Sequence, residues 1–280
     1  MRKWELKNGT SILSELVSFD PKTQKVVLRT HDHKLVEYSE GDFSAIDRAW
    51  LLEWSESAKE LKDLEAELGG KVEHLQTTGK YPTNLYVYHP SKKADQPPTT
   101  EKPPVMILFH TGDQALRYMW KHMAAAEAAK LTLVSCGSFH NTRSEEDEAE
   151  MNARFAEVLP WIEQHIQHDP KRLFMGGTSG AACRSYDYSA RFIRPWAGIY
   201  ANGGWLGGPE NYERPYPKGM RIAMVNGDKD ERANSWIQPD SEVLVKAGND
   251  VAVMAFEGGH QVPPVSVQTK AFRWLLREID

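Results

Sequence analysis

Residues 172–188 read RLFMGGTSGAACRSYDY and predict a strand, a sharp turn and a helix, with a serine at the turn. The apolar run 173–175 favours the strand, and the pattern of residues 182–194 favours the helix. The small residues on both sides of Ser179 leave room for a strained turn and for a closely packed helix. A serine at such a turn stands above the sheet, where the first amides of the helix face any negative charge that develops.

The same stretch comes close to the pattern Gly-x-Ser-x-Gly, which marks a nucleophilic serine. Gly177, Thr178, Ser179 and Gly180 fill the first four places, and Ala181 stands at the fifth. A glycine-rich turn whose serine caps a helix would show the same residues, because serine is a preferred N-cap. The rest of the chain has to decide between these two interpretations.

The composition is that of a globular protein with a large core. The chain has 280 residues, of which 40% are hydrophobic and 26% charged, and a net charge of −5. That charge speaks against a nucleic-acid surface, and no apolar run reaches the roughly 18 residues of a membrane span. The start shows no signal peptide, so the location stays open between export, if a leader was removed, and the cytoplasm. Cys136 and Cys183 are too few for a disulfide scaffold; they could form one bridge, but buried thiols are the favoured interpretation.

Residues 1–50 differ in texture from the rest of the chain. Short alternating segments separated by turn signals such as Asn8-Gly9 predict a small β-barrel. The segment resembles the SLA1 homology domain 1 family, an SH3-like module, at Arg2, Trp4, Gly9, Val26, Leu28, Val36 and Asp47. The resemblance implies a peptide or protein partner, and a packing or spacer role is the alternative. Residues 51–70 then predict a helical linker, because leucines recur there at helical spacing before two glycines.

Residues 71–280 alternate between apolar runs and helical patterns. Strands are predicted at 72–78, 84–89, 105–109, 131–135, 173–175, 196–202, 221–226 and 251–256. Helices are predicted at 118–130, 145–167, 182–194, 240–248 and 265–279. This alternation predicts an α/β domain with a mainly parallel sheet that helices cover on both faces.

Three candidate reactive groups each follow a predicted strand, namely Ser179, Asp230 and His260. The carboxyl ends of parallel strands meet at one edge of the sheet, so these side chains are expected to lie together. A histidine can take the serine proton and pass it on, and an aspartate can orient the imidazole. Asp228 and Glu231 are alternatives for the acid, and either aspartate could simply form a turn.

The order Ser, Asp, His with a strand–turn–helix around the serine resembles the α/β-hydrolase family over residues 71–280. The strings NLYVYHP, ILFHTG, HDPKRLFMGGTSGAA, VNGDKD and GGHQVP resemble its polyhydroxyalkanoate depolymerase-like and feruloyl-esterase-like branch. The resemblance implies a serine esterase that cleaves small-molecule or polymer-linked carboxylic esters through an acyl-enzyme, without cofactor or metal. The family's Gly-x-x-Asp spacing favours Asp230 as the acid.

The resemblance also implies an oxyanion hole built from the N–H of Gly180 and that of Thr111 or Gly112. Thr111 departs from the family, which has a glycine after the histidine. The candidate substrate-binding residues are His110, which can instead brace the oxyanion loop, and His140, Tyr200 and Trp205. Loop packing explains the two aromatic residues equally well. A non-catalytic binding protein and a peptidase on the same scaffold are the alternative functions.

Overall fold

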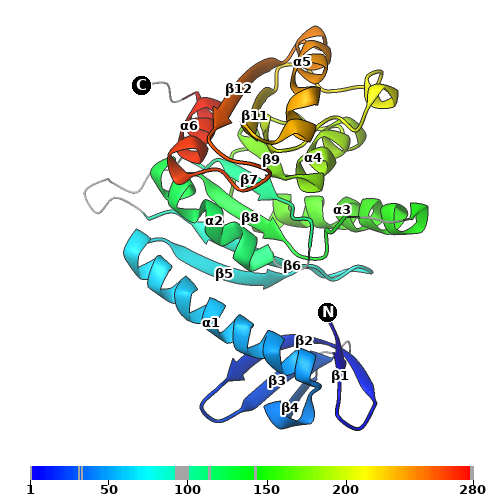
Figure 1. Cartoon of the computed structure of the whole chain (residues 1–280), viewed down its shortest axis with the longest axis vertical. Coiled ribbons are helices and arrows are strands. Elements are labelled where there is room, and N and C mark those ends of the chain that lie inside the picture. Colours follow the sequence, from blue (N-terminus) through cyan, green and yellow to red (C-terminus); the bar gives the residue numbers. More distant parts are fainter. Residues whose placement is uncertain are drawn as a thin grey trace. The chain divides into compact units, whose positions relative to one another are not determined.

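The computed structural model describes residues 2–30, 32, 34–91, 101–112, 115–141 and 144–277. The chain divides into two compact units, Met1–Glu67 and Leu68–Asp280, which are described separately below. Each unit has its own cluster of buried apolar side chains. Most helices and strands of both units are labelled in Figure 1.

The first unit contains a four-stranded antiparallel sheet. Its strands β1 (Arg2–Glu5), β2 (Ser11–Asp20), β3 (Lys25–Thr30) and β4 (Leu35–Ser39) are neighbours in chain order. A short 3₁₀ helix, η1 (Glu40–Asp42), follows β4, and the chain then returns to the first strand, where Leu6 pairs with Phe43. Trp4 is fully buried, packs edge-on against Phe43 and donates its indole N–H to the carbonyl of Ser14 at 3.1 Å. The sheet therefore encloses a small aromatic core of its own.

Helix α1 (Ala45–Leu68) begins six residues before the predicted linker. The carboxylate of Asp47 is buried and accepts the backbone N–H of Glu5 at 2.8 Å, which fixes the first turn of the helix to β1. Leu51 is fully buried in the first unit's core, and Trp54 packs against the same core. The first half of α1 is thus part of the N-terminal unit, because its apolar stripe covers the sheet.

The second unit is built on an eight-stranded sheet in the order β12-β11-β10-β9-β7-β8-β6-β5. The strands β5 and β6 run antiparallel to their neighbours, and the other strands pair in parallel. Their bounds are β5 (Lys71–Gln76), β6 (Asn84–His89), β7 (Val105–Leu108), β8 (Thr132–Cys136), β9 (Leu173–Thr178), β10 (Gly198–Asn202), β11 (Arg221–Gly227) and β12 (Asp250–Phe256).

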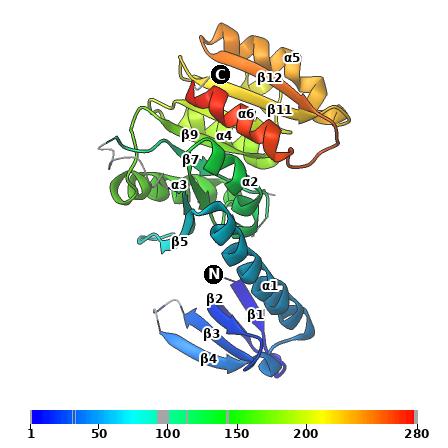
Figure 2. The same cartoon turned by 90° about the vertical axis from the view of Figure 1, so that its left-hand side faces the viewer.

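Helices cover both faces of this sheet (Figure 2). They are α2 (Ala115–Ala128), α3 (Glu145–His165), α4 (Gly180–Arg191), α5 (Glu231–Lys246) and α6 (Val265–Leu276), with a 3₁₀ turn, η2 (Pro209–Asn211), between β10 and β11. The helices α2 and α6 pack against each other on one face. Among the described residues, no helix combines the length and the apolar character that a membrane crossing needs. The predicted mainly parallel sheet with helices on both faces is therefore confirmed.

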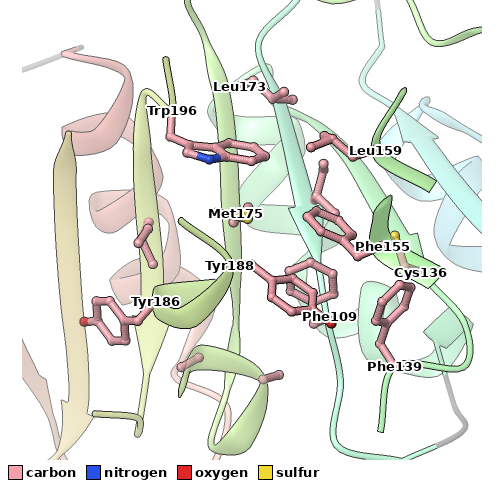
Figure 3. Close-up of a cluster of buried hydrophobic side chains, with 14 of the residues drawn as sticks. Phe109, Cys136, Phe139, Phe155, Leu159, Leu173, Met175, Tyr186, Tyr188 and Trp196 are labelled. Carbon is pink, nitrogen blue, oxygen red and sulfur yellow. The ribbon is translucent and has the colours of Figure 1, made fainter. Parts of the chain in front are cut away.

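The opposite face carries the larger part of the core, where α3 and α4 meet β7 and β9 (Figure 3). Phe109, Phe155 and Tyr188 lie at its centre, with ring centroids 4.6 to 5.4 Å apart. Cys136 is buried in the same cluster, and both it and the half-buried Cys183 are free thiols, as expected. This core fixes the positions of β9 and α4, between which Ser179 lies.

We expect a chain of residues 68–280 to fold without the N-terminal unit, because each unit buries its own apolar cluster. Circular dichroism should show one cooperative thermal transition for the shortened chain, with helix and strand content in proportion. A shortened chain that is insoluble or that unfolds without a transition would mean that the first unit is part of the larger unit's core.

Candidate active site

The turn between β9 and α4 holds Ser179 in a strained backbone conformation. Its φ is +62° and its ψ is −130°, a region that residues with a side chain rarely adopt. Strain of this kind costs on the order of 1 to 3 kcal/mol and persists only where the surroundings impose it. The hydroxyl makes no helix-capping hydrogen bond although Ser179 is the N-cap of α4. The geometry therefore favours the nucleophile over the capping interpretation.

The small residues around Ser179 are required by close packing. A Cβ added at Gly177 would lie 2.5 Å from the Cβ of Ala181, and one added at Gly204 would lie 2.9 Å from the carbonyl oxygen of Ser179. Any larger side chain at either glycine would push α4 away from the sheet. The alanine at position 181 is buried and fits there, which explains why the departure from the glycine pattern is tolerated.

His260 and Asp230 form a close pair at the ends of β11 and β12. Nδ1 of His260 lies 2.6 Å from Oδ2 of Asp230. Asp230 is only 6% exposed and also caps α5, where it accepts the N–H of Ala233 at 3.3 Å. Asp228, the alternative acid, is exposed and accepts the N–H of Gly258 at 2.9 Å. Of the two aspartates, Asp230 is thus the one that contacts the imidazole.

Two consecutive glycines at the end of β10 connect this pair with the serine. A Cβ on Gly203, whose φ is +59°, would lie 3.1 Å from Nδ1 and Cε1 of His260 and 3.2 Å from Oδ2 of Asp230. The next residue, Gly204, lies against the carbonyl of Ser179. Neighbouring Cα atoms are about 3.8 Å apart, so the three candidate residues gather at one edge of the sheet. The side chain of His260 is 44% exposed to solvent.

The two segments expected to supply oxyanion donors meet at an asparagine that the sequence analysis missed. Asn141 donates its backbone N–H to the carbonyl of Thr111 at 3.3 Å. Its side-chain amide lies so close to Gly180 that a Cβ there would come within 2.8 Å of Cγ. Thr111 and Gly112 are both exposed at the end of β7. Asn141 therefore links the loop after β7 to the turn that carries Ser179.

The candidate substrate-binding residues fall in different environments. His110 is 4% exposed, with its ring 6.4 Å from that of Tyr118, which suits the bracing role better than a substrate contact. His140 is exposed, and its carbonyl accepts from Arg184 at 2.9 Å. Trp205 is half-buried beside Gly204, and the guanidinium of Arg232 lies 4.8 Å from its ring.

Tyr200 is a core residue, in place of the expected substrate contact. It is fully buried in β10, with Phe272 of α6 at 5.1 Å and His122 of α2 at 5.8 Å between ring centroids. Burial raises the pKa of its phenol well above the ordinary value. Alternate residues of a strand point to opposite faces, which turns Tyr200 toward α2 and α6 while Ile199 and Ala201 join the other core.

Tyr118 of α2 is a second residue that the sequence analysis missed. It contacts the residue before Ser179 and so supports the turn between β9 and α4. Its hydroxyl donates to Oγ1 of Thr178, next to Ser179, at 2.5 Å. Burial raises the pKa of Tyr118, so the phenol keeps its proton and its donor role at any physiological pH. In the part of the chain that the structure covers, no three His, Cys, Asp or Glu side chains gather as a metal site requires.

The same fold occurs in solved structures of esterases with little sequence identity. An esterase from Mycobacterium marinum aligns over 85% of this chain and 90% of its own, with a TM-score of 0.61 and 16% identity. An S-formylglutathione hydrolase from Staphylococcus aureus aligns over 74% of this chain and 96% of its own, with a TM-score of 0.54 and 12% identity. A ferulic acid esterase aligns over 75% of this chain and 99% of its own, with a TM-score of 0.53 and 15% identity. These likenesses establish the α/β-hydrolase fold.

No family model and no curated protein matches the sequence. The resemblance of residues 1–50 to the SLA1 homology domain 1 family therefore stays a prediction.

We expect Gly203→Ala to displace the imidazole of His260 by a few tenths of an ångström, and any hydrolysis of p-nitrophenyl acetate that depends on the His260–Asp230 pair should fall roughly tenfold. Gly219→Ala is the matched control, since Gly219 also has a positive φ, +80°, but nothing lies within 4 Å of an added Cβ. Steady-state rates and Tm of both variants check the prediction. Equal activity losses in the two variants would show that backbone strain alone, and no contact with His260, causes the effect.

Proposed function

We propose that this chain is a serine esterase in which Ser179 is the nucleophile, His260 the base and Asp230 the group that orients the base. One observation carries the proposal. The His260–Asp230 pair, 2.6 Å apart, lies at the same strand ends as a strained serine whose hydroxyl makes no capping bond. Strained residues with a side chain concentrate at functional sites, which supports a reactive role for this serine.

In the proposed reaction, Oγ of Ser179 attacks the ester carbonyl carbon while its proton moves to Nε2 of His260. Asp230 holds the proton on Nδ1, which leaves Nε2 ready to accept. The electron pair of the carbonyl moves to its oxygen, which the N–H groups of Gly180 and of Thr111 or Gly112 would stabilise. The intermediate then expels the alcohol, which takes the proton from His260, and the acyl group stays on Ser179.

The second half of the reaction repeats these steps with water. His260 takes a proton from a water molecule, whose oxygen attacks the acyl carbon, and the acid leaves as Ser179 recovers its proton. Neither half needs a cofactor or a metal. His140 and Trp205 both keep exposed surface near the site, and we propose them as contacts for the substrate.

Carboxylic esters, free or attached to a polymer, are the proposed substrates. The structural neighbours carry the names esterase, ferulic acid esterase and S-formylglutathione hydrolase, which favours cleavage of esters over cleavage of peptide bonds. A peptidase on this scaffold and a non-catalytic binding protein are the alternatives. The peptide or protein partner expected for residues 1–50 stays a separate prediction, since the proposed chemistry uses residues of the second unit alone.

The proposal is tested with a panel of p-nitrophenyl acyl esters, feruloyl methyl esters, acetylated sugars and peptide p-nitroanilides. We expect turnover of at least one ester class, with a burst of p-nitrophenol that matches the protein concentration, and no turnover of the anilides. Anilide cleavage at rates comparable to the esters would favour the peptidase. Binding of esters without any burst or turnover would favour the non-catalytic alternative.

A further inference from the structure

We propose that Asn202 is a positioning residue that holds the loop of His260 at the correct distance from the turn of Ser179. This inference rests on the proposed function and adds to it a buried residue outside the triad. Asn202 is the last residue of β10 and is only 1% exposed. A buried amide is expensive unless its hydrogen-bonding groups are satisfied, so its contacts indicate what holds it there.

The amide nitrogen of Asn202 joins the neighbours of two triad members. Nδ2 donates to Oγ1 of Thr178, the residue before Ser179, at 2.9 Å. The same nitrogen donates to the carbonyl of Gln261, the residue after His260, at 2.9 Å. A side-chain amide has two N–H groups, and each finds one acceptor here. One atom therefore connects the serine turn with the histidine loop.

The backbone around Asn202 contacts the triad as well. Its carbonyl accepts the N–H of Ser179 at 2.8 Å, and the following residue, Gly203, lies so close to the ring of His260 and the carboxylate of Asp230 that an added Cβ would come within 3.2 Å of both. Gly203 is in turn held by β11, because its N–H lies 3.1 Å from Oδ1 of Asn226. Asn202 is thus fixed from both sides, and its amide can transmit that fixed position to the two loops.

The chemistry of the contacts requires an amide at this position. Both acceptors present lone pairs to Nδ2, and Oγ1 of Thr178 also accepts the hydroxyl hydrogen of Tyr118. A carboxylate would place an acceptor against the carbonyl of Gln261, and an apolar side chain would leave that carbonyl and Thr178 without this donor. Asp230 links the histidine loop to α5, whereas Asn202 links it to the strand that carries the nucleophile.

The test compares Asn202→Ala with Asn249→Ala in the full chain. Asn249 is likewise buried, at 6% exposed, and its side chain accepts the N–H of Met220 at 3.0 Å. It directly precedes β12, so it lies at the amino-terminal ends of the parallel strands, away from Ser179 and His260 at the carboxyl ends. We expect the Tm of both variants to be lower than that of the wild-type chain. Only Asn202→Ala should also lose kcat on p-nitrophenyl acetate, by roughly 10- to 100-fold with KM little changed, since a misplacement of about 1 Å can cost 10²-fold in rate.

A second pair of variants keeps the inference testable if Asn202→Ala does not fold. Thr178→Val removes the oxygen that accepts from Asn202 and from Tyr118, and Thr178→Ser keeps it. We expect Thr178→Val to lower kcat and Thr178→Ser to restore most of the loss. Wild-type kcat in Asn202→Ala, an equal loss in Asn249→Ala, or equal kcat in the two Thr178 variants would overturn the inference.

Failure of the proposed function would be seen separately, in the wild-type chain. If wild-type protein turns over esters and Asn202→Ala does so equally well, the esterase proposal stands and the positioning role fails. If wild-type protein shows no turnover and no reaction of Ser179 with a fluorophosphonate, the esterase proposal fails and the positioning role fails with it.

Discussion

Ser179→Ala is expected to abolish ester hydrolysis, with a loss in kcat of about 10⁶-fold, the size known for a serine hydrolase without its nucleophile. The acyl-enzyme forms only on the serine hydroxyl, so its removal eliminates the covalent route. We expect the substitution to leave the fold intact, because Ser179 makes no side-chain capping bond to α4. Rates on p-nitrophenyl acetate, read against the buffer background, check this prediction.

Ser179→Gly provides a matched control for this prediction. It should be as inactive as Ser179→Ala, yet more stable, because glycine adopts a φ of +62° without strain. The relief of about 1 to 3 kcal/mol is partly offset by the greater freedom of glycine in the unfolded chain. A rise in Tm together with complete loss of turnover would separate the serine's chemistry from its backbone strain. Full activity in either variant would contradict the mechanism.

Asp230→Asn is expected to lower kcat on the order of 10⁴-fold, the loss known for a serine protease whose triad aspartate is replaced by asparagine. Asparagine keeps the shape, but its amide lacks the charge that stabilises the imidazolium and can hold the wrong tautomer of His260. The bond from Nδ1 of His260 to Oδ2 of Asp230, at 2.6 Å, is the contact that the substitution changes.

Asp228→Asn is the control for the acid, and it should change kcat by less than about tenfold. Its carboxylate accepts the N–H of Gly258 instead of contacting the imidazole, and it is exposed to solvent. An amide oxygen can accept the same bond. Loss of activity in Asp228→Asn with retention in Asp230→Asn would transfer the orienting role to Asp228.

Local sequence signals were sufficient for the sheet and for the turn at Ser179. Buried strands covered on both faces read as continuous apolar runs, and β7, β8 and β11 are buried at every position. Gly177 indicates the close approach of α4 to β9, because a Cβ there would lie 2.5 Å from the Cβ of Ala181, whereas a Cβ on Gly176 would meet Tyr200 of β10. These features depend on neighbours in the chain, so a single sequence reveals them.

The starts of α5 and α1 differ most from the predicted helix starts, whereas the starts of α2 and α4 differ by three and two residues. Helix α5 begins at Glu231, nine residues before the predicted start, and contains Pro239 inside it. The capping of α5 by Asp230 was hidden, since aspartate after a strand also fits a turn. Helix α1 begins at Ala45, where the N–H of Asp47 donates to Oγ of Ser44 and the carboxylate of Asp47 accepts the N–H of Glu5, a contact with β1 that spacing alone does not reveal.

The residues that support the site make contacts between segments that are distant in the sequence. The spacing of apolar and polar residues along the chain does not predict such contacts. Asn202 contacts residue 261, and Tyr118 contacts residue 178. Asn141 carries no motif, although it lies between the oxyanion loop and Gly180. Tyr200 shows the converse error, since its position inside a buried strand, before the loop, already pointed to the core.

Reaction of the full chain with a fluorophosphonate, followed by peptide mass mapping, tests the central claim most directly. The proposed mechanism predicts one phosphonyl adduct per chain, located on Ser179, and no adduct in Ser179→Ala. It also predicts slower labelling in Asp230→Asn, because the reagent needs the same activated hydroxyl. An unlabelled wild-type chain, or an adduct on another residue that persists in Ser179→Ala, would contradict it.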